Sequence, residues 1–124
     1  MRAAPGNELV ANNLAYVLAQ SKRDPASLDR ALNLANRFAG STEPGYVDTL
    51  GLVQYRLGRY DQAATLLERA RSLAPNDPTV ELHYGMALYK KGDVQNGAEL
   101  VRKALATKTP LADHDEAQTL IGRV

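Results

Sequence analysis

The chain repeats itself at a fixed interval. A shift of 34 residues places Gly51 on Gly85 and Ala70 on Ala104. Further pairs at the same shift are Tyr55 and Tyr89, Gly58 and Gly92, Ala64 and Ala98, and Leu66 and Leu100. The shared positions are mostly small or apolar and recur at helical spacing. A repeat of this length indicates stacked helix-turn-helix units that bury a continuous core between them.

Each of these two units is predicted to form a pair of helices. Gly58 and Gly92 interrupt the apolar spacing in the middle of the units, and Pro44 and Pro78 open them. Asp77 strengthens the second start, because its carboxylate can accept from free amides of the first helical turn. We expect helices near 44–57, 60–73, 78–91 and 94–106.

A diverged third copy precedes these units, and a last helix follows them. In the upstream copy Ala15 stands in the place of Gly51, and its helices are expected near 7–20 and 28–39. Asp113 and Glu116 have the spacing of a capping box that opens the last helix. We predict one all-α domain over 1–124, with repeats at about 9–43, 44–77 and 78–110 and a capping helix at about 113–122.

These units resemble the tetratricopeptide repeat. The second unit carries the family's small and apolar residues as Leu50-Gly51, Ala63, Leu67, Ala70 and Pro75. The corresponding residues of the third unit are Tyr84-Gly85, Gly97, Val101 and Ala104. The family's Trp is missing, and its places are taken by Ala11, Val47 and Glu81. The resemblance implies a right-handed α-solenoid of three helix pairs with a C-terminal capping helix, and a binding role without catalysis.

Composition and the absence of motifs exclude several other functions. Fifteen basic and fourteen acidic side chains give a net charge of +1, so no large field attracts nucleic acid or an anionic membrane. Cysteine is absent, and the two histidines, His83 and His114, are too far apart to form a metal-ligand pair on one helix turn. No phosphate-binding loop or nucleophile elbow occurs. We predict no enzyme, cofactor, metal, nucleic-acid partner or direct membrane insertion.

The resemblance implies a concave groove formed by the first helix of each pair. The residues at its positions are Asn12, Asn13, Tyr16, Gln20, Asp48, Thr49, Leu52, Tyr55, Arg56, Leu82, His83, Met86, Tyr89 and Lys90. This mixture of apolar, aromatic, amide and cationic side chains suits an extended or helical peptide from a protein partner. The alternative is that Leu52, Tyr55 and Tyr89 only pack between neighbouring helices.

The first predicted helix is apolar nearly all round, which indicates neighbours on more than one side. Its apolar residues are Leu9, Val10, Leu14, Tyr16, Val17 and Leu18. Either the chain is the C-terminal piece of a longer repeat array, or it forms a homodimer through residues 9–18. The amino-acid sequence of the repeats resembles that of long bacterial proteins of this family, several of which serve exopolysaccharide export or envelope assembly. The compartment stays open between periplasm or envelope and cytoplasm.

Overall fold

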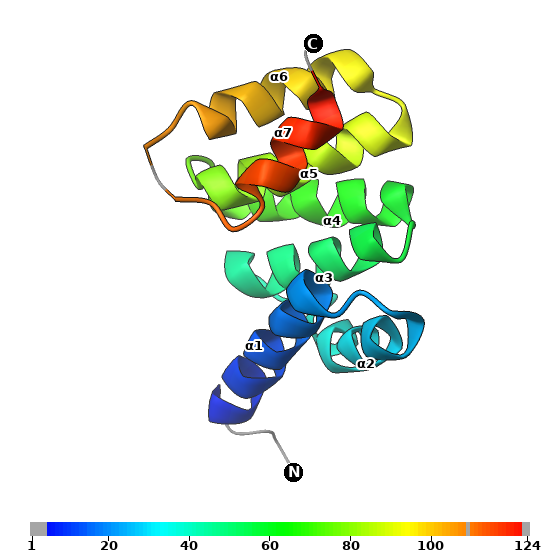
Figure 1. Cartoon of the computed structure of the whole chain (residues 1–124). Coiled ribbons are helices and arrows are strands. Elements are labelled where there is room, and N and C mark those ends of the chain that lie inside the picture. Colours follow the sequence, from blue (N-terminus) through cyan, green and yellow to red (C-terminus); the bar gives the residue numbers. More distant parts are fainter. Residues whose placement is uncertain (1–4, 109, 123–124) are drawn as a thin grey trace.

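The computed structural model describes residues 5–108 and 110–122, and it is helical throughout its ordered elements (Figure 1). Within these residues there are seven α-helices, one 3-10 helix and no strand. The elements are α1 (Pro5–Ser21), α2 (Pro25–Ala35), η1 (Asn36–Phe38), α3 (Pro44–Arg56), α4 (Tyr60–Leu73), α5 (Pro78–Lys91), α6 (Val94–Leu105) and α7 (His114–Ile121). The predicted all-α class is confirmed.

The predicted helix bounds agree with the structure most closely in the two regular units. α4 and α5 have the expected bounds, and α3 and α6 each end one residue earlier. α2 differs more, because it begins at Pro25 rather than near 28. Asp24 explains this start: its carboxylate accepts from the Ser27 amide at 3.1 Å and caps the helix. α2 also ends at Ala35 rather than near 39, and the short 3-10 helix η1 follows it.

The helices stack in antiparallel pairs, and the first helices line up along one side. α1 packs on α2, α3 on α4 and α5 on α6, while α1 contacts α3 and α3 contacts α5. We call the side formed by α1, α3 and α5 the first-helix face. This stacking of adjacent helices is that of the expected solenoid. The repeat boundaries within the chain stay a prediction.

Glycines allow the helices of a pair to approach closely. A Cβ at Gly97 would lie 2.5 Å from the amide nitrogen of Tyr89 and 2.7 Å from the carbonyl oxygen of Gly85. At Gly51 the obstacle is instead the side chain of Leu67, at 2.6 Å. α5 and α6 therefore cross backbone against backbone, whereas α3 and α4 are separated by one leucine side chain.

The last helix, α7, does not simply extend the stack beyond α6. Figure 1 shows α7 crossing in front of α5, and its backbone contacts α5 and α6. Ala117 and Ile121 are buried against this pair, as is Leu111 in the segment before the helix. The position of α7 brings its first turn over the first-helix face.

None of the helices in the described part of the chain combines the length and the apolar character that crossing a bilayer requires.

Candidate functional site

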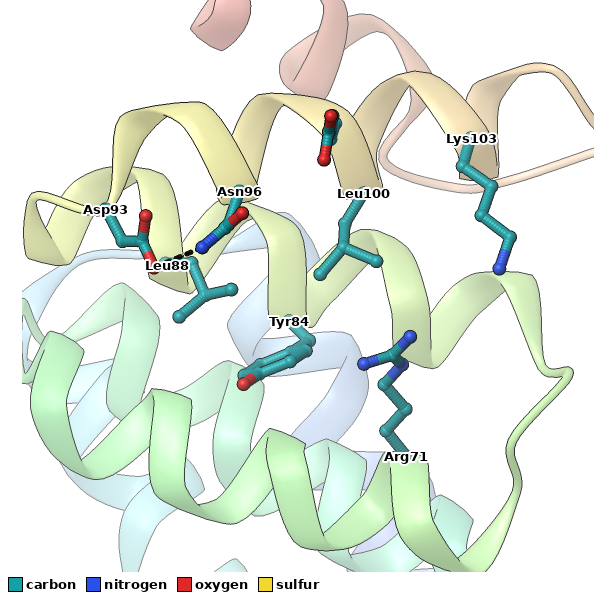
Figure 2. A pocket seen from close by; sticks show the side chains of 8 residues that line it. Arg71, Tyr84, Leu88, Asp93, Asn96, Leu100 and Lys103 are labelled. Atoms are coloured by element: carbon teal, nitrogen blue, oxygen red, sulfur yellow. Dashed lines mark hydrogen bonds between the residues drawn. The ribbon is translucent and has the colours of Figure 1, made fainter.

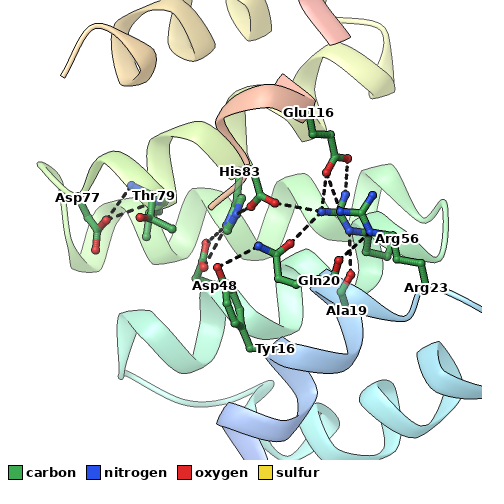
Figure 3. A network of polar contacts seen from close by, with 12 residues as sticks. Tyr16, Ala19, Gln20, Arg23, Asp48, Arg56, Asp77, Thr79, His83 and Glu116 are labelled. Atoms are coloured by element: carbon green, nitrogen blue, oxygen red, sulfur yellow. Dashed lines mark hydrogen bonds and ion pairs between the residues drawn. The ribbon is translucent and has the colours of Figure 1, made fainter. Parts of the chain in front are cut away.

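Arg56, at the end of α3, is the centre of a polar network on the first-helix face (Figure 3). Its Nη1 and Nη2 donate to the two carboxylate oxygens of Glu116 at 2.6 and 2.8 Å. Nη2 also lies 3.2 Å from Asp113 and 3.1 Å from the amide oxygen of Gln20. Nε donates to the carbonyl oxygen of Ala19 at 3.1 Å. The side chain is only 4% exposed, and each of its three nitrogens donates to α1, to Asp113 or to α7.

His83, on α5, is buried between two carboxylates. Its Nδ1 lies 2.8 Å from Asp48 Oδ1, and its Nε2 lies 2.5 Å from Asp113 Oδ2. Burial by itself would lower the pKa of His83, but the charges and hydrogen bonds of Asp48 and Asp113 outweigh it and raise the pKa to about 10. The ring is therefore an imidazolium at neutral pH and donates from both nitrogens.

Six charged side chains form a series whose sign alternates along its length. The order is Asp48, His83, Asp113, Arg56, Glu116 and Arg23. We call this series the ionic chain. It begins in the interior at Asp48, which is 5% exposed, and ends at Arg23, whose side chain is 44% exposed. Every buried charge in the series thus has an oppositely charged neighbour, which offsets the cost of removing it from water.

The charges around Asp113 also shift its pKa, as expected for a member of the ionic chain. Burial acts to raise the pKa of its carboxyl, but the hydrogen bond and charge of His83, together with Arg56, outweigh burial and hold that pKa below its usual range. Tyr16 lies at the margin, where its hydroxyl accepts from Gln20 Nε2 at 3.2 Å. Burial, followed by the charges of Asp113 and Asp48, raises the pKa of this phenol.

The structure separates the predicted groove residues into three groups. Five of them are buried: Asp48, Leu52, Tyr55, His83 and Met86. Asn12, Tyr16, Arg56 and Tyr89 are partly exposed as whole residues, and Asn13 and Lys90 are exposed. Of the other residues at groove positions, Thr49 and Leu82 are buried and Gln20 is partly exposed.

The buried members of the predicted groove have contacts within the chain. Leu52 packs with side chains of α1 and α2, and Tyr55 packs with Met86 and the apolar side of α7. The Tyr55 ring also stands edge-on to Tyr60, with centroids 5.4 Å apart. For Leu52 and Tyr55, packing between helices, the alternative weighed from the sequence, is what the structure shows. His83 has no free ring nitrogen for a peptide while Asp113 is in place.

The prediction of a capping box at Asp113 and Glu116 is wrong. Asp113 precedes α7, but its carboxylate makes no bond to the free amides of that helix. It binds His83 and Arg56 instead, and Glu116 binds Arg56 and Arg23. Charged partners form stronger hydrogen bonds than neutral amides do, so the ionic chain takes both carboxylates.

Sequence reasoning also missed Arg23 as a member of the site. Arg23 follows α1 with a φ of 55°, the left-handed conformation in which glycine is usual after a helix. Its Nε donates to the carbonyl oxygen of Gln20 at 3.1 Å, and its Nη2 reaches Glu116 at 2.9 Å. The sequence offered no signal for this role, because the left-handed conformation of Arg23 and its contact with Glu116 are visible only in the structure.

Two hollows lie beside α7 on the first-helix face. One, of about 440 Å³, lies between the end of α1 and the start of α7, and Tyr16, Val17 and Gln20 line it. The other, of about 430 Å³, is lined by Tyr55, Lys90 and Leu120. Among the exposed and partly exposed members of the predicted groove, Tyr16, Gln20 and Lys90 therefore border space that α7 leaves open.

A separate cleft of about 510 Å³ lies between α4, α5 and α6 (Figure 2). Arg71 and Lys103 stand at one end of it, and Tyr84 lies beside the Arg71 guanidinium with 5.8 Å between that group and the ring centroid. Buried Glu81 forms an ion pair with each cation, at 3.2 Å from Lys103 Nζ and 3.9 Å from Arg71 Nε. Because Glu81 already holds these cations, the cleft is a weaker candidate than the first-helix face.

Comparison with known proteins identifies the family. Residues 49–120, more than half of the chain, match a family model described as the tetratricopeptide repeat. The chain belongs to the tetratricopeptide-repeat (TPR) family. The match extends from α3 into α7, so it includes four of the six members of the ionic chain: Arg56, His83, Asp113 and Glu116.

Two curated relatives carry the TPR name as well. A TPR repeat-containing protein of Pseudomonas aeruginosa is 30% identical over 115 residues, covering 87% of this chain and 18% of the relative. A tetratricopeptide repeat protein 30 homolog of Drosophila pseudoobscura pseudoobscura is 26% identical over 99 residues, covering 80% of this chain and 15% of the relative. The chain therefore spans less than a fifth of the length of either relative.

Membership of the TPR family indicates a general role. TPR proteins generally act as protein-interaction scaffolds, and they generally do so without catalysis. In residues 5–108 and 110–122 no group of three or more His, Cys, Asp or Glu side chains is placed to hold a metal ion. The contacts described on the first-helix face are ion pairs, hydrogen bonds and apolar contacts.

Proposed function

We propose that this chain is a non-catalytic scaffold that binds a segment of a partner protein along the first-helix face. The observation that carries the proposal is that this face already holds one helical segment, α7, through both apolar and charged contacts. A surface that binds a helix from its own chain has the shape and the chemistry to bind one from another protein.

The open hollows support the same conclusion. Tyr16 and Gln20 border one of them, and Tyr55 and Lys90 border the other. Aromatic rings beside amide and ammonium groups are typical of surfaces that bind peptides, because each contributes apolar area together with a directional polar contact. The predicted peptide-binding role of Asn13, Tyr89 and the other groove residues is part of this proposal.

The test is to select ligands without prior assumption and then to locate where they bind. A phage-displayed peptide library is selected against the immobilised chain, and a synthetic copy of the best binder is titrated into the ¹⁵N-labelled chain. We expect amide shifts to concentrate at Tyr16, Gln20 and Lys90. A matched pair of variants, Lys90→Glu on this face and Thr65→Glu on α4, should respectively weaken binding and leave it unchanged.

Selected peptides that shift α4 residues such as Gln62 and Thr65, and not the first helices, would contradict the proposal. The same conclusion follows if Lys90→Glu and Thr65→Glu weaken binding equally, because a charge effect unrelated to position would then explain both.

A second candidate function, self-association, is favoured by the exposed surface of α1. Leu9, Val10 and Val17 are large apolar residues that are 52%, 64% and 51% exposed. All three lie within residues 9–18, and the proposed occupant is the same surface of a second copy. Burying these residues against one another would remove the apolar area that each copy otherwise exposes to water.

Sedimentation over a concentration series tests self-association. We expect a dimer that dissociates on dilution, and Leu9→Asp with Val10→Asp should give a monomer at every concentration. Asn13→Asp, which adds a charge at another exposed position of α1, is the matched control and should leave the dimer intact. A wild-type chain that is monomeric throughout would contradict this second function.

We further propose that the chain is the C-terminal part of a longer bacterial TPR protein of the exopolysaccharide-export or envelope-assembly type. Its short span relative to both relatives, one of which is bacterial, is the support for this proposal. Fractionation of the source cells, with immunodetection of the full-length protein, distinguishes an envelope location from a cytoplasmic one.

A further inference from the structure

The residue at the N-cap position of α7 binds the first-helix face and does not cap its own helix. Asp24 and Asp77 precede α2 and α5, and each accepts a hydrogen bond from an amide of the helix that follows. Asp113 has the same position before α7, but its carboxylate binds His83 and Arg56 instead. An N-cap hydrogen bond stabilises the helix that it precedes. α7 is therefore fastened by contacts to other helices rather than by its own local structure.

The groups that receive α7 are held in place independently of it. Arg56 is fixed by the Ala19 carbonyl and the Gln20 amide, both on α1. His83 is fixed by Asp48 on α3. Without α7, the face would present the cations Arg23, Arg56 and His83 against the single carboxylate of Asp48. Such a preorganised cationic surface favours an acidic ligand, because little ordering entropy is lost on binding.

We infer that the first-helix face is a receptor for an acidic amphipathic helix, and that α7 is its resident occupant, which a partner segment of the same chemistry replaces. The inference rests on the proposed function and specifies its ligand. The ligand carries carboxylates three residues apart, like Asp113 and Glu116, and apolar residues at the spacing of Ala117 and Ile121.

The dimensions of α7 make the exchange feasible. α7 has eight residues, and an isolated helix of that length is marginal in water. A longer partner helix with the same acidic spacing could add contacts in the two hollows beside α7, which the resident segment does not fill. The attachment of α7 within the same chain gives it a high effective concentration, so the partner must exceed α7 in intrinsic affinity.

The experiment uses the full chain and a peptide that copies α7. A fluorescein-labelled peptide with the sequence of residues 110–122 is titrated into the wild-type chain and into the Glu116→Gln chain, and anisotropy is measured. Glu116→Gln removes the bidentate partner of Arg56 from the resident helix and leaves the receptor groups intact. We expect the variant chain to bind the peptide at least about ten-fold more tightly than the wild-type chain does.

Asp115→Asn is the matched control on the same helix. The Asp115 side chain is fully exposed, and among residues 5–108 and 110–122 its one ion-pair partner is its neighbour His114, at 3.3 Å. This variant should bind the peptide as the wild-type chain does. A peptide with Asn and Gln in place of Asp113 and Glu116 should bind neither variant. The inference is overturned if Glu116→Gln and Asp115→Asn chains bind equally, or if the neutral peptide binds as well as the acidic one.

A second measurement uses the wild-type chain, so its result does not depend on whether a variant folds. Amide hydrogen exchange is followed with and without a large excess of the α7 peptide. Replacement predicts that amides of α7 lose protection while those of α5 and α6 keep theirs, and unchanged protection of α7 in a peptide-saturated chain overturns the inference.

The two proposals fail in distinguishable ways. If library-selected peptides shift the first helices while α7 stays protected, the face binds partners beside α7, so the proposed function stands and the inference falls. If neither the selected peptides nor the α7 peptide reaches the first-helix face, both fall.

Discussion

Glu116 binds Arg56 through both of its carboxylate oxygens, at 2.6 and 2.8 Å, across 60 residues of sequence. The planar fork of a guanidinium matches a carboxylate in this geometry, which fixes orientation as well as distance. Because Arg56 also binds Ala19 and Gln20, this one side chain joins α7, α3 and α1. The position of the last helix thus depends on a residue of the second helix pair.

Arg56→Met is expected to lower the free energy of unfolding by about 3–5 kcal/mol. The substitution retains most of the apolar stem but leaves the Asp113 carboxylate, 3% exposed, without its guanidinium partner. Urea unfolding followed by circular dichroism measures the loss. Arg23→Met removes the exposed end of the same ionic chain and should cost less than about 1 kcal/mol. Equal losses would show that the loss of stability does not depend on how deeply the ion pair is buried.

The stability of the chain should fall on both sides of a plateau in pH. His83 has a folded-state pKa of about 10 against an ordinary 6.5, so its contribution is complete below pH 6.5 and is lost as the pH rises through about 10. The folded-state pKa of Asp113 is lowered from 3.8, so its contribution is complete above pH 3.8 and is lost as the pH falls through that lowered value.

Urea midpoints between neutral pH and about pH 10 measure the alkaline side. His83→Gln should be less stable at neutral pH and should show a flatter decline over this interval, because the substituted side chain does not titrate. His114→Gln, at an exposed position of α7, should retain the wild-type slope. A His83→Gln chain with an unchanged slope would assign the decline to other groups.

Gly97→Ala should destabilise the chain by about 1–3 kcal/mol through overpacking. The added Cβ would lie within 3 Å of backbone atoms of Tyr89 and Gly85, which cannot rotate away. Thermal unfolding of the variant tests this against Gly45→Ala, where no atom lies within 4 Å and the change should be close to neutral. A harmless Gly97→Ala would mean that α5 and α6 can separate without loss.

Asp77→Ala should cost about 1 kcal/mol, because it removes the acceptor for the amides of Thr79 and Val80 at the start of α5. Asp93 has the same position before α6, but it accepts from the side-chain amide of Asn96 at 3.1 Å and caps no backbone amide of that helix. Asp93→Ala should therefore cost less in the same urea measurement. If the two losses are the same, the capping bond does not account for the effect of Asp77.

The bounds of the regular helices followed from local features of the sequence. Pro44 and Pro78 open helices where the missing amide does no harm, and Gly92 closes α5 with a left-handed φ of 118°. The repeat at 34 residues indicated the stacking, since units of this kind bury their apolar sides only against one another. These signals depend on residues within one or two turns of each other, which is why they could be recognised without a structure.

Only the tertiary structure decided the partners of Asp113, Glu116 and Arg56. Local spacing favoured a capping box, but the stacking of the helix pairs brings His83 and Arg56 to the start of α7, and charged partners at that distance outcompete backbone amides. The same stacking buries Leu52 and Met86, which the resemblance to the TPR family placed in an open groove. Helical periodicity indicates which side of its own helix a residue occupies. Whether that side meets solvent or another helix depends on contacts between distant parts of the chain.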